Sequence, residues 1–493
     1  MPAARRRPAR IAVWSLVGAL AGGLGWATAL GTGSDGPEAR SDTVAVAAAS
    51  GENAPALALE TIVAAGKAVY ALSADHQGVY EWSSDRANWL KVRGATKNLY
   101  AGGDGVYATD QATGDITKYD GEPGRWTRIG DPGHAFVATT THVSGDKSFD
   151  RLFGISPDRS GVWEHTGKGD AAWTRIGEQA ASLYTIPAEK VSLTGIKAVQ
   201  DLEKRRKKGT LFATDPVTGD IRKYDDKPGQ WTTIGGPGAA FAVTDENLYG
   251  LTPDGGAVVE YDVDRKKWNP VGGPAGTILA SNTLYSTNRE TGDLYKYNGR
   301  PGLWNRVSGP AAAFVTTGDL LYRLAPDKRS VQTYSGDGSN DKWRDLRAPA
   351  APATREEKLA RLDSLVQPGD AAFNDWARAL GAHRTGEPDR YEFDWTTNKC
   401  NEPAPNMISD FDFTLACIRH DFGYRNYKDL QGEDTFKHGP DWNAPKDRVD
   451  RIFQQDLHTI CNAVTFPRNH TAAERKICRE TADAYFAAVV AAG

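Results

Sequence analysis

A repeat occupies the middle of the 493-residue chain and restricts the folds that this part can adopt. Its clearest copies share a Thr-Gly-Asp turn, a Lys-Tyr pair and a Pro-Gly-x-Trp turn. The Trp recurs at seven positions, with 36 to 39 residues between neighbours in four intervals and more in two. These positions are Trp89, Trp126, Trp173, Trp231, Trp268, Trp304 and Trp343. A period near forty with four short strands in each unit predicts a β-propeller.

One copy shows the expected strands of a unit. We expect a small, apolar strand at residues 239–243, two further strands at 248–251 and 258–261, and a fourth strand that opens at Trp268. Gly, Asp and Pro separate these segments, as is typical of tight turns between strands. We therefore expect about seven four-stranded blades over residues 56–347. Six or eight blades stay open, because the first and third copies are degenerate.

The repeated Trp has two interpretations, packing between blades or an aromatic platform for a sugar, and we favour packing. The repeat resembles tectonin and tachylectin-type propellers in its Trp, Gly and Tyr placement. Some of those propellers bind sugars, so the resemblance implies a carbohydrate or protein partner. One insertion, residues 192–209, ends in the basic run 204–208. That run could rest on anionic lipid, although we favour a solvated helix end.

The N-terminus has the pattern of an export signal. Arg5, Arg6, Arg7 and Arg10 precede an uncharged run over residues 11–30. We predict a signal peptide, or alternatively a membrane anchor, over residues 1–30, followed by a disordered spacer over 31–55. Both alternatives place the remaining chain outside the cytoplasm, either secreted or held at the outer face of the membrane. The net charge of −4 does not suggest a nucleic-acid partner.

Beyond an Ala-Pro linker at residues 348–353, the pattern becomes helical, and we predict an all-α domain over 354–493. Thr354 with Glu357, and Thr471 with Glu474, form capping boxes that mark two helix starts. We expect the helix after Thr471 to bury Ile477.

Two further helices bring a histidine and an aspartate within reach of each other. His420, Tyr424 and Tyr427 follow at i, i+4 and i+7 of one predicted helix. Pro445 suits the first turn of the next. If these helices lie antiparallel, Asp450 faces His420.

All four Cys follow residue 399. An even count in an exported chain indicates disulfides, with three connectivities open.

The segment 416–427 (ACIRHDFGYRNY) places the His-Asp pair three residues after a Cys in an aromatic-rich helix. It resembles the secreted bacterial and fungal phospholipase A2 family. The similarity also covers residues 393–395 (FDW), 448–453 (RVDRIF) and the four Cys. It implies an all-α, disulfide-bonded fold after the propeller, with the pairs Cys400–Cys417 and Cys461–Cys478.

The resemblance also implies roles for individual residues. His420 would be the general base and Asp450 would orient it. Asp421 would ligate Ca²⁺ together with an Asp and a backbone carbonyl just before the first Cys. Here those two positions hold Asn398 and Lys399. An amide oxygen can ligate calcium but brings no charge.

Two functions are therefore expected as alternatives. The first is an exported, calcium-dependent phospholipase A2 that uses a His-Asp-activated water on the sn-2 ester of phospholipids in a membrane or micelle, with the propeller as a binding or targeting module. No Gly-x-Ser-x-Gly motif offers a serine nucleophile. The second is a lectin-like binding protein whose phospholipase fold has weakened calcium binding and little activity.

Overall fold

The computed structural model describes most of the chain after its N-terminal segment. The described residues are 54–102, 105–143, 147–165, 172–186, 210–244, 247–262, 265–334, 343–387, 389–400, 406–408, 410–438, 444–462 and 469–492. The predicted signal or anchor and the insertion at 192–209 lie outside them.

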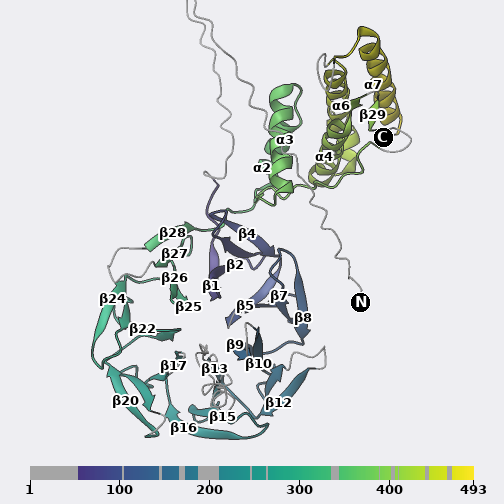
Figure 1. The fold of residues 1–493 in the computed structure, drawn as a ribbon. Helices are drawn as coiled ribbons and strands as arrows, with labels where there is room; N and C mark the ends of the chain where they lie inside the picture. Colours follow the sequence, from purple (N-terminus) through teal and green to yellow (C-terminus); the bar gives the residue numbers. More distant parts are fainter. Residues whose placement is uncertain are drawn as a thin grey trace, which may run out of the picture. The chain divides into compact units, whose positions relative to one another are not determined.

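Residues 59–347 form seven four-stranded antiparallel sheets arranged around a ring (Figure 1). The first four blades comprise β1 (Leu59–Ala65), β2 (Ala68–Ser73), β3 (Val79–Ser83), β4 (Asn88–Arg93), β5 (Thr96–Gly102), β6 (Gly105–Asp110), β7 (Ile116–Tyr119), β8 (Trp126–Gly130), β9 (Ala135–Val143), β10 (Lys147–Ile155), β11 (Val162–His165), β12 (Trp173–Gly177), β13 (Ser182–Ile186), β14 (Thr210–Thr214), β15 (Asp220–Tyr224) and β16 (Trp231–Pro237). The last three comprise β17 (Ala240–Val243), β18 (Leu248–Leu251), β19 (Val258–Asp262), β20 (Lys267–Gly272), β21 (Ile278–Ala280), β22 (Leu284–Thr287), β23 (Leu294–Tyr297), β24 (Trp304–Ser308), β25 (Ala313–Thr317), β26 (Leu320–Leu324), β27 (Val331–Tyr334) and β28 (Trp343–Arg347). The predicted seven-bladed propeller is confirmed, and the degenerate first and third copies are complete blades.

The Thr-Gly-Asp turns follow directly from local chemistry. In each turn, an Asp or Asn side chain accepts backbone N–H groups two and three residues further on. The Gly then takes a positive φ, which glycine adopts without a steric penalty. These glycines are Gly114, Gly219 and Gly292, with φ of 78°, 76° and 73°.

The repeated Trp joins neighbouring blades. Each indole Nε1 donates a hydrogen bond to a backbone carbonyl of the adjacent blade, at 2.9 to 3.2 Å. The pairs are Trp89 with Leu346, Trp126 with Val92, Trp173 with Ile129, Trp231 with Ile176, Trp268 with Ile234, Trp304 with Val271 and Trp343 with Val307. This geometry agrees with the packing interpretation.

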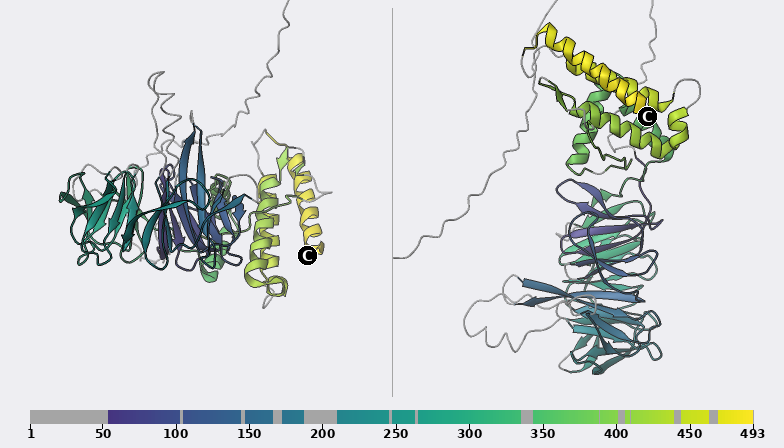
Figure 2. Two further views of the ribbon diagram at one scale, coloured as in Figure 1. Left: turned by 90° about the horizontal axis from the view of Figure 1, so that it is seen from below. Right: turned by 90° about the vertical axis from the view of Figure 1, so that its right-hand side faces the viewer.

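The same contact closes the ring, because Trp89 of the first blade bonds to Leu346 of the last. Apolar side chains of both blades form one buried cluster, and Ala56 pairs with Ala350 outside the blades. Closure protects strand edges that an open sheet would expose. The hairpin of β9 and β10, nine residues in each strand, projects beyond the ring (Figure 2). This projection was not predicted from the sequence.

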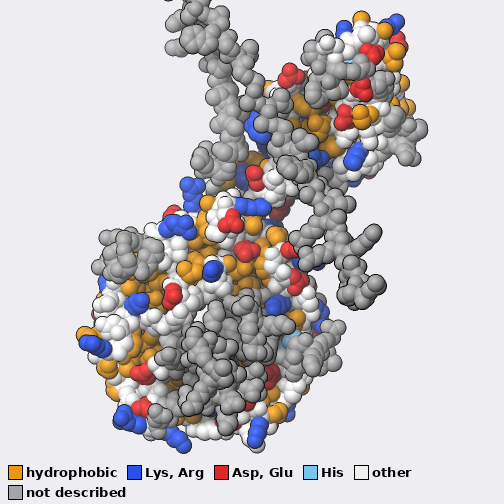
Figure 3. All heavy atoms as spheres, in the orientation of Figure 1, with side chains coloured by type: hydrophobic (Ala, Val, Ile, Leu, Met, Phe, Trp, Pro, Cys, Tyr) orange, Lys and Arg blue, Asp and Glu red, His pale blue; other side chains and the backbone are white. Residues whose placement is uncertain are grey.

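Lys and Arg side chains are spread around the rim of the ring rather than gathered on one blade (Figure 3). Several pair with acids of the same blade, such as Arg128 with Asp115 and Arg306 with Asp293. Exposed pairs of this kind contribute at most about 1 kcal/mol each.

Residues after 354 form helices, with one short hairpin. The helices are α2 (Arg355–Leu365), α3 (Asp370–Arg384), α4 (Thr414–Gln431), α5 (Glu433–His438), α6 (Pro445–Cys461) and α7 (Ala472–Ala492), and the hairpin is β29 (Met407–Ile408) with β30 (Phe411–Asp412). Disulfides join Cys400 to Cys417 and Cys461 to Cys478, the pairing that the resemblance implied. Within the described residues, no helix is long and apolar enough to cross a membrane.

The helix starts follow the sequence closely. Thr354 and Glu357 form the expected capping box on α2, and Thr471 and Glu474 exchange the equivalent bonds ahead of α7. The prediction for Ile477 is wrong, because its side chain is 55% exposed. On α7 the buried face instead carries Cys478 and Ala482. The disulfide at Cys478 therefore sets which side of α7 faces the core.

Candidate active site

Helices α4 and α6 lie antiparallel and bring His420 to Asp450. Tyr424 meets Asp450 near the start of α6, whereas Arg419, one turn earlier on α4, meets Asp456 further along α6. Gly423 allows this close approach, because a Cβ there would lie 3.0 Å from Val449. His420 Nε2 lies 2.9 Å from Asp450 Oδ1.

The imidazole of His420 is held by two aromatic rings. Its centroid lies 4.4 Å from that of Tyr424 and 4.8 Å from that of Phe453. Its side chain is 12% exposed, so it keeps limited access to solvent. Because Asp450 accepts the Nε2 proton, the neutral ring carries its lone pair on Nδ1. Nδ1 is therefore the nitrogen that can accept a proton from another molecule.

The Asp450 carboxylate is 1% exposed and receives three donors. Tyr424 Oη donates to Oδ1 at 2.8 Å, alongside His420, and Lys446 Nζ donates to Oδ2 at 2.8 Å. Burial opposes ionisation, but the hydrogen bonds from His420, Lys446 and Tyr424 outweigh it and lower the pKa of Asp450. Burial and the bond to Asp450 raise the pKa of Tyr424. Asp450 is therefore a carboxylate facing a neutral phenol.

A second buried ion pair stabilises the same helices. The Arg419 guanidinium binds both oxygens of Asp456, at 3.0 and 2.9 Å, and also the carbonyls of Leu365 and Gln367. Burial raises the pKa of Asp456 despite this partner. Arg419 thus joins the end of α2 to α4 and α6.

The loop ahead of Cys400 is fastened to α4. Asn426, 3% exposed, accepts the Asp394 N–H at 2.8 Å and donates to the Asp394 carbonyl at 2.9 Å. Trp395 stacks on Phe422 with centroids 4.4 Å apart. The loop therefore enters the site from a fixed point beside α4.

The end of this loop, which carries the predicted calcium residues Asn398 and Lys399, contacts the third one, Asp421 of α4. Thr397 Oγ1 donates to Asp421 Oδ2 at 2.6 Å, and the Asn398 N–H donates to the same oxygen at 3.1 Å. The Lys399 N–H donates to Thr397 Oγ1 at 2.9 Å. Lys399 itself has a φ of 59°, a left-handed conformation that is uncommon for a residue with a side chain.

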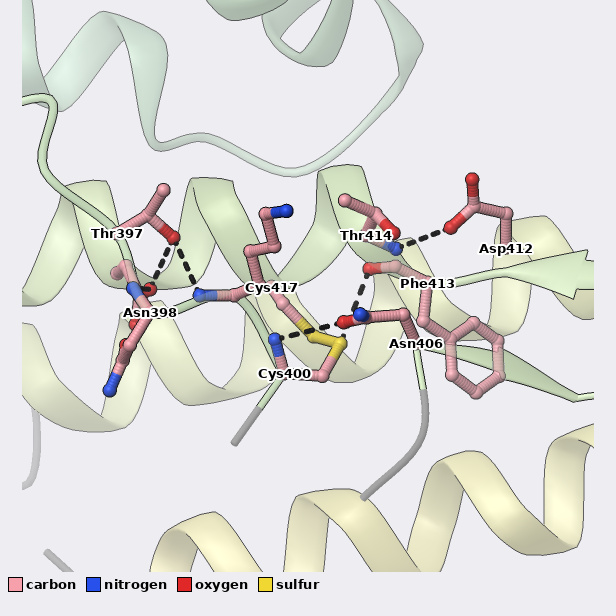
Figure 4. The surroundings of a disulfide bond; sticks show 10 residues. Thr397, Asn398, Cys400, Asn406, Asp412, Phe413, Thr414 and Cys417 are labelled. Carbon is pink, nitrogen blue, oxygen red and sulfur yellow. Dashed lines mark hydrogen bonds between the residues drawn. A yellow bond between two sulfur atoms is a disulfide. The ribbon is translucent and has the colours of Figure 1, made fainter. Parts of the chain in front are cut away.

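The disulfide of Cys400 fixes the other end of the loop to α4. The Cys400 N–H donates to Asn406 Oδ1, and the Asn406 carbonyl accepts the N–H of Phe413, the residue before α4 (Figure 4). The segment that carries Asn398 and Lys399 is therefore anchored on both sides. In the described part of the chain, no three His, Cys, Asp or Glu side chains form a metal-binding group.

Four residues of this site were not predicted from the sequence: Thr397, Asn426, Lys446, and Tyr424 in its role as a hydrogen-bond donor. Tyr424 and Lys446 each carried a signal, since they stand one helical turn from His420 and from Asp450. Thr397 and Asn426 form hydrogen bonds with residues that are distant in sequence, and no local pattern indicates such bonds.

Comparison with known proteins identifies this region. Residues 370–493 match the family model of prokaryotic phospholipase A2. The C-terminal region is a phospholipase A2 domain. Its relatives include secretory phospholipases A2 of Beauveria bassiana, 34% identical over 96 residues, and of Arthroderma benhamiae, 33% identical over 95. These matches cover 20% and 19% of this chain and 42% and 55% of the relatives, so the chain spans about half the length of each.

Two solved structures resemble parts of this chain at low sequence identity. A puromycin-hydrolyzing peptidase of Mycobacterium tuberculosis is 13% identical with a TM-score of 0.40, covering 61% of this chain and 55% of its own. A virginiamycin B lyase of Staphylococcus aureus is 10% identical with a TM-score of 0.32, covering 49% and 80%. Similarity at this level does not bear on function.

Proposed function

We propose that this protein is an exported, calcium-dependent phospholipase A2 that hydrolyses the sn-2 ester of glycerophospholipids. The observation that carries the proposal is the 2.9 Å contact between His420 Nε2 and Asp450 Oδ1 inside a domain of the phospholipase A2 family. The secretory relatives support export.

In this proposal, His420 and Asp450 activate a water molecule. Asp450 holds the Nε2 proton, which leaves Nδ1 to remove a proton from water as it attacks the ester carbonyl. As the proton arrives, the imidazolium that forms is stabilised by the buried carboxylate. Tyr424 helps keep Oδ1 in place. No serine or cysteine nucleophile takes part.

The oxygen atoms around Asp421 fit a hard cation such as Ca²⁺. The Asp421 carboxylate, the Asn398 side-chain oxygen and the Lys399 carbonyl would hold it. The bonds from Thr397 and Asn398 to Asp421 support this assignment, because they bring the loop against the one carboxylate of the set. When bound, the cation supplies positive charge to the developing oxyanion and to the phosphate. With a single carboxylate, affinity is expected to be weak.

We further propose that the propeller is the binding or targeting module, with a carbohydrate, protein or membrane partner. The second candidate function is a lectin-like binding protein with little lipase activity. One observation favours it, the neutral Asn398 and basic Lys399 in the loop where the family places an Asp and a carbonyl.

Release of a labelled sn-2 fatty acid from phospholipid micelles, titrated with calcium, tests the proposal. We expect release that rises with calcium, stops with a chelator, and falls at least ~10²–10⁴-fold in His420→Ala, as for loss of a general base. The matched control is His458→Ala, because His458 pairs with Asp483 at 2.8 Å away from the site. No release at any calcium concentration would favour the binding protein, and full activity in His420→Ala would exclude the mechanism.

A further inference from the structure

A third ionisable side chain contacts the His420–Asp450 pair from the opposite side. Lys446 Nζ lies 2.8 Å from Asp450 Oδ2, and Lys446 is only 7% exposed. Oδ1 of the same carboxylate takes His420 and Tyr424. Both oxygens are thus occupied, and the plane of the carboxylate is fixed from two sides.

We propose that Lys446 is a positioning residue for the general base, which holds the Asp450 carboxylate in the orientation that presents Oδ1 to His420 Nε2. The catalytic part of this inference rests on the proposed phospholipase function. The positioning part concerns the imidazole itself and does not depend on lipid hydrolysis.

The location of Lys446 argues against a role in holding the bundle together. Lys446 and Asp450 stand one turn apart on the same helix, so their ion pair joins no two elements. Arg419, by contrast, connects α2, α4 and α6 through Asp456 and two carbonyls. Burial of the Lys446 ammonium costs solvation and side-chain freedom, and the ion pair with Asp450 offsets this cost without linking two elements.

The position within α6 is also unfavourable for a cation. Pro445 begins the helix and Lys446 follows in its first turn, where the unpaired N–H groups carry positive partial charge. Cations are destabilising there and acids are favoured. A buried ammonium at this place is therefore explained by the carboxylate that it binds.

Removal of the ammonium changes what Asp450 can do. A carboxylate that is 1% exposed would lose its only lysine or arginine partner among the described residues. It would then turn toward another donor or take up a proton. Either change weakens the bond from His420 Nε2, and the ring loses its fixed tautomer.

The test compares Lys446→Met with wild-type full-length protein. We expect kcat to fall about 10- to 100-fold, the loss typical of a residue that orients a metal ligand through a hydrogen bond, with KM nearly unchanged. The matched control is Lys437→Met, since Lys437 forms an i,i+4 pair with Glu433 at the exposed surface. It should retain wild-type kcat. If Lys446→Met does not fold, Lys446→Gln serves for the same comparison.

A spectroscopic readout separates this inference from the proposed function. Two-bond ¹H–¹⁵N correlation of histidine-labelled protein, with His420 assigned through His420→Gln, reports which ring nitrogen carries the proton. We expect an Nε2–H ring in wild type and a mixture of tautomers in Lys446→Met. An unchanged Nε2–H ring, or a kcat equal to wild type, overturns the role of Lys446. Absence of lipid hydrolysis in wild type would overturn only the proposed function, because the ring signal still decides the positioning role.

Discussion

In the propeller the same polar contact recurs at every blade junction, whereas in the helical region each buried polar contact occurs once. Seven indoles donate to seven carbonyls in equivalent places. Buried charged side chains, by contrast, lie mainly in the helical region. Among the described residues, the buried Lys, Arg, Asp and Glu side chains are Arg151 in the propeller and Arg419, Lys446, Asp450 and Asp456 in the helical region.

The difference has a physical consequence for the two regions. A contact that is repeated can be lost at one junction while six others hold the ring, so the effect stays local. A buried charge that loses its only partner has no substitute, and the cost is large. A reaction that needs an oriented carboxylate is therefore better served by the helical region. The propeller can accept substitutions at single blade junctions.

The largest expected difference concerns the disulfides, which lie in the helical region alone. Replacement of Cys461 and Cys478 by Ala opens a loop of 17 residues and should cost about 3 kcal/mol of unfolding free energy. Thermal unfolding followed by helical circular dichroism should shift downwards. Tryptophan fluorescence, to which residues 59–347 contribute nine indoles and residues 354–493 three, should keep its main transition, which is that of the propeller. Equal shifts in both signals would show that the two regions unfold as one unit.

A smaller effect is expected from the charge of the loop. Asn398→Asp adds a second carboxylate near Asp421, and one more charge should tighten calcium binding by ~1–3 kcal/mol, or ~5- to 150-fold. Calorimetric titration with calcium and the calcium needed for half-maximal activity measure it. The matched control is Asn298→Asp on the propeller, where the amide only closes a turn. If Asn398→Asp leaves the calcium requirement unchanged, Asn398 is not a ligand.

The smallest effect is expected within the repeat. Trp231→Phe removes the donor to the Ile176 carbonyl, and one such hydrogen bond contributes about 1 kcal/mol. Trp126→Phe removes the equivalent donor to Val92 and should cost the same. Urea unfolding of the two variants measures both free energies. Unequal losses, or a loss above that of the disulfide, would contradict the equivalence of the blades.

The propeller was predictable because its signals are local and repeated. A Gly with positive φ after an Asx turn, and a Trp at or next to the start of the last strand of each blade, recur often enough that single irregular copies do not hide the period. The helix starts at Thr354 and Thr471 were equally local. The projecting hairpin of β9 and β10 was not predicted, because a longer strand carries no sequence motif that distinguishes it from a shorter one.

The candidate site was only partly predictable. His420 and Asp450 meet as the helical spacing suggested, since antiparallel helices place them on facing sides. Their catalytic roles, the calcium residues and the domain boundaries stay predictions. Ile477 was placed wrongly, because an apolar residue at a helical spacing faces the core only if the helix is rotated that way, and the disulfide of Cys478 sets the rotation of α7.

The repeat, the turns, the helix starts and the residue types of a possible site follow from the order of the amino acids, because each depends on neighbours within a few positions. Which charges are buried, and which partners they have, follows from the packing of distant segments. Arg419 pairs with Asp456, and Asn426 accepts the N–H of Asp394. Asp450 accepts Lys446 on one oxygen and His420 and Tyr424 on the other. The physical reason is that burial of a charge depends on every element packed around it, and no local pattern carries that information.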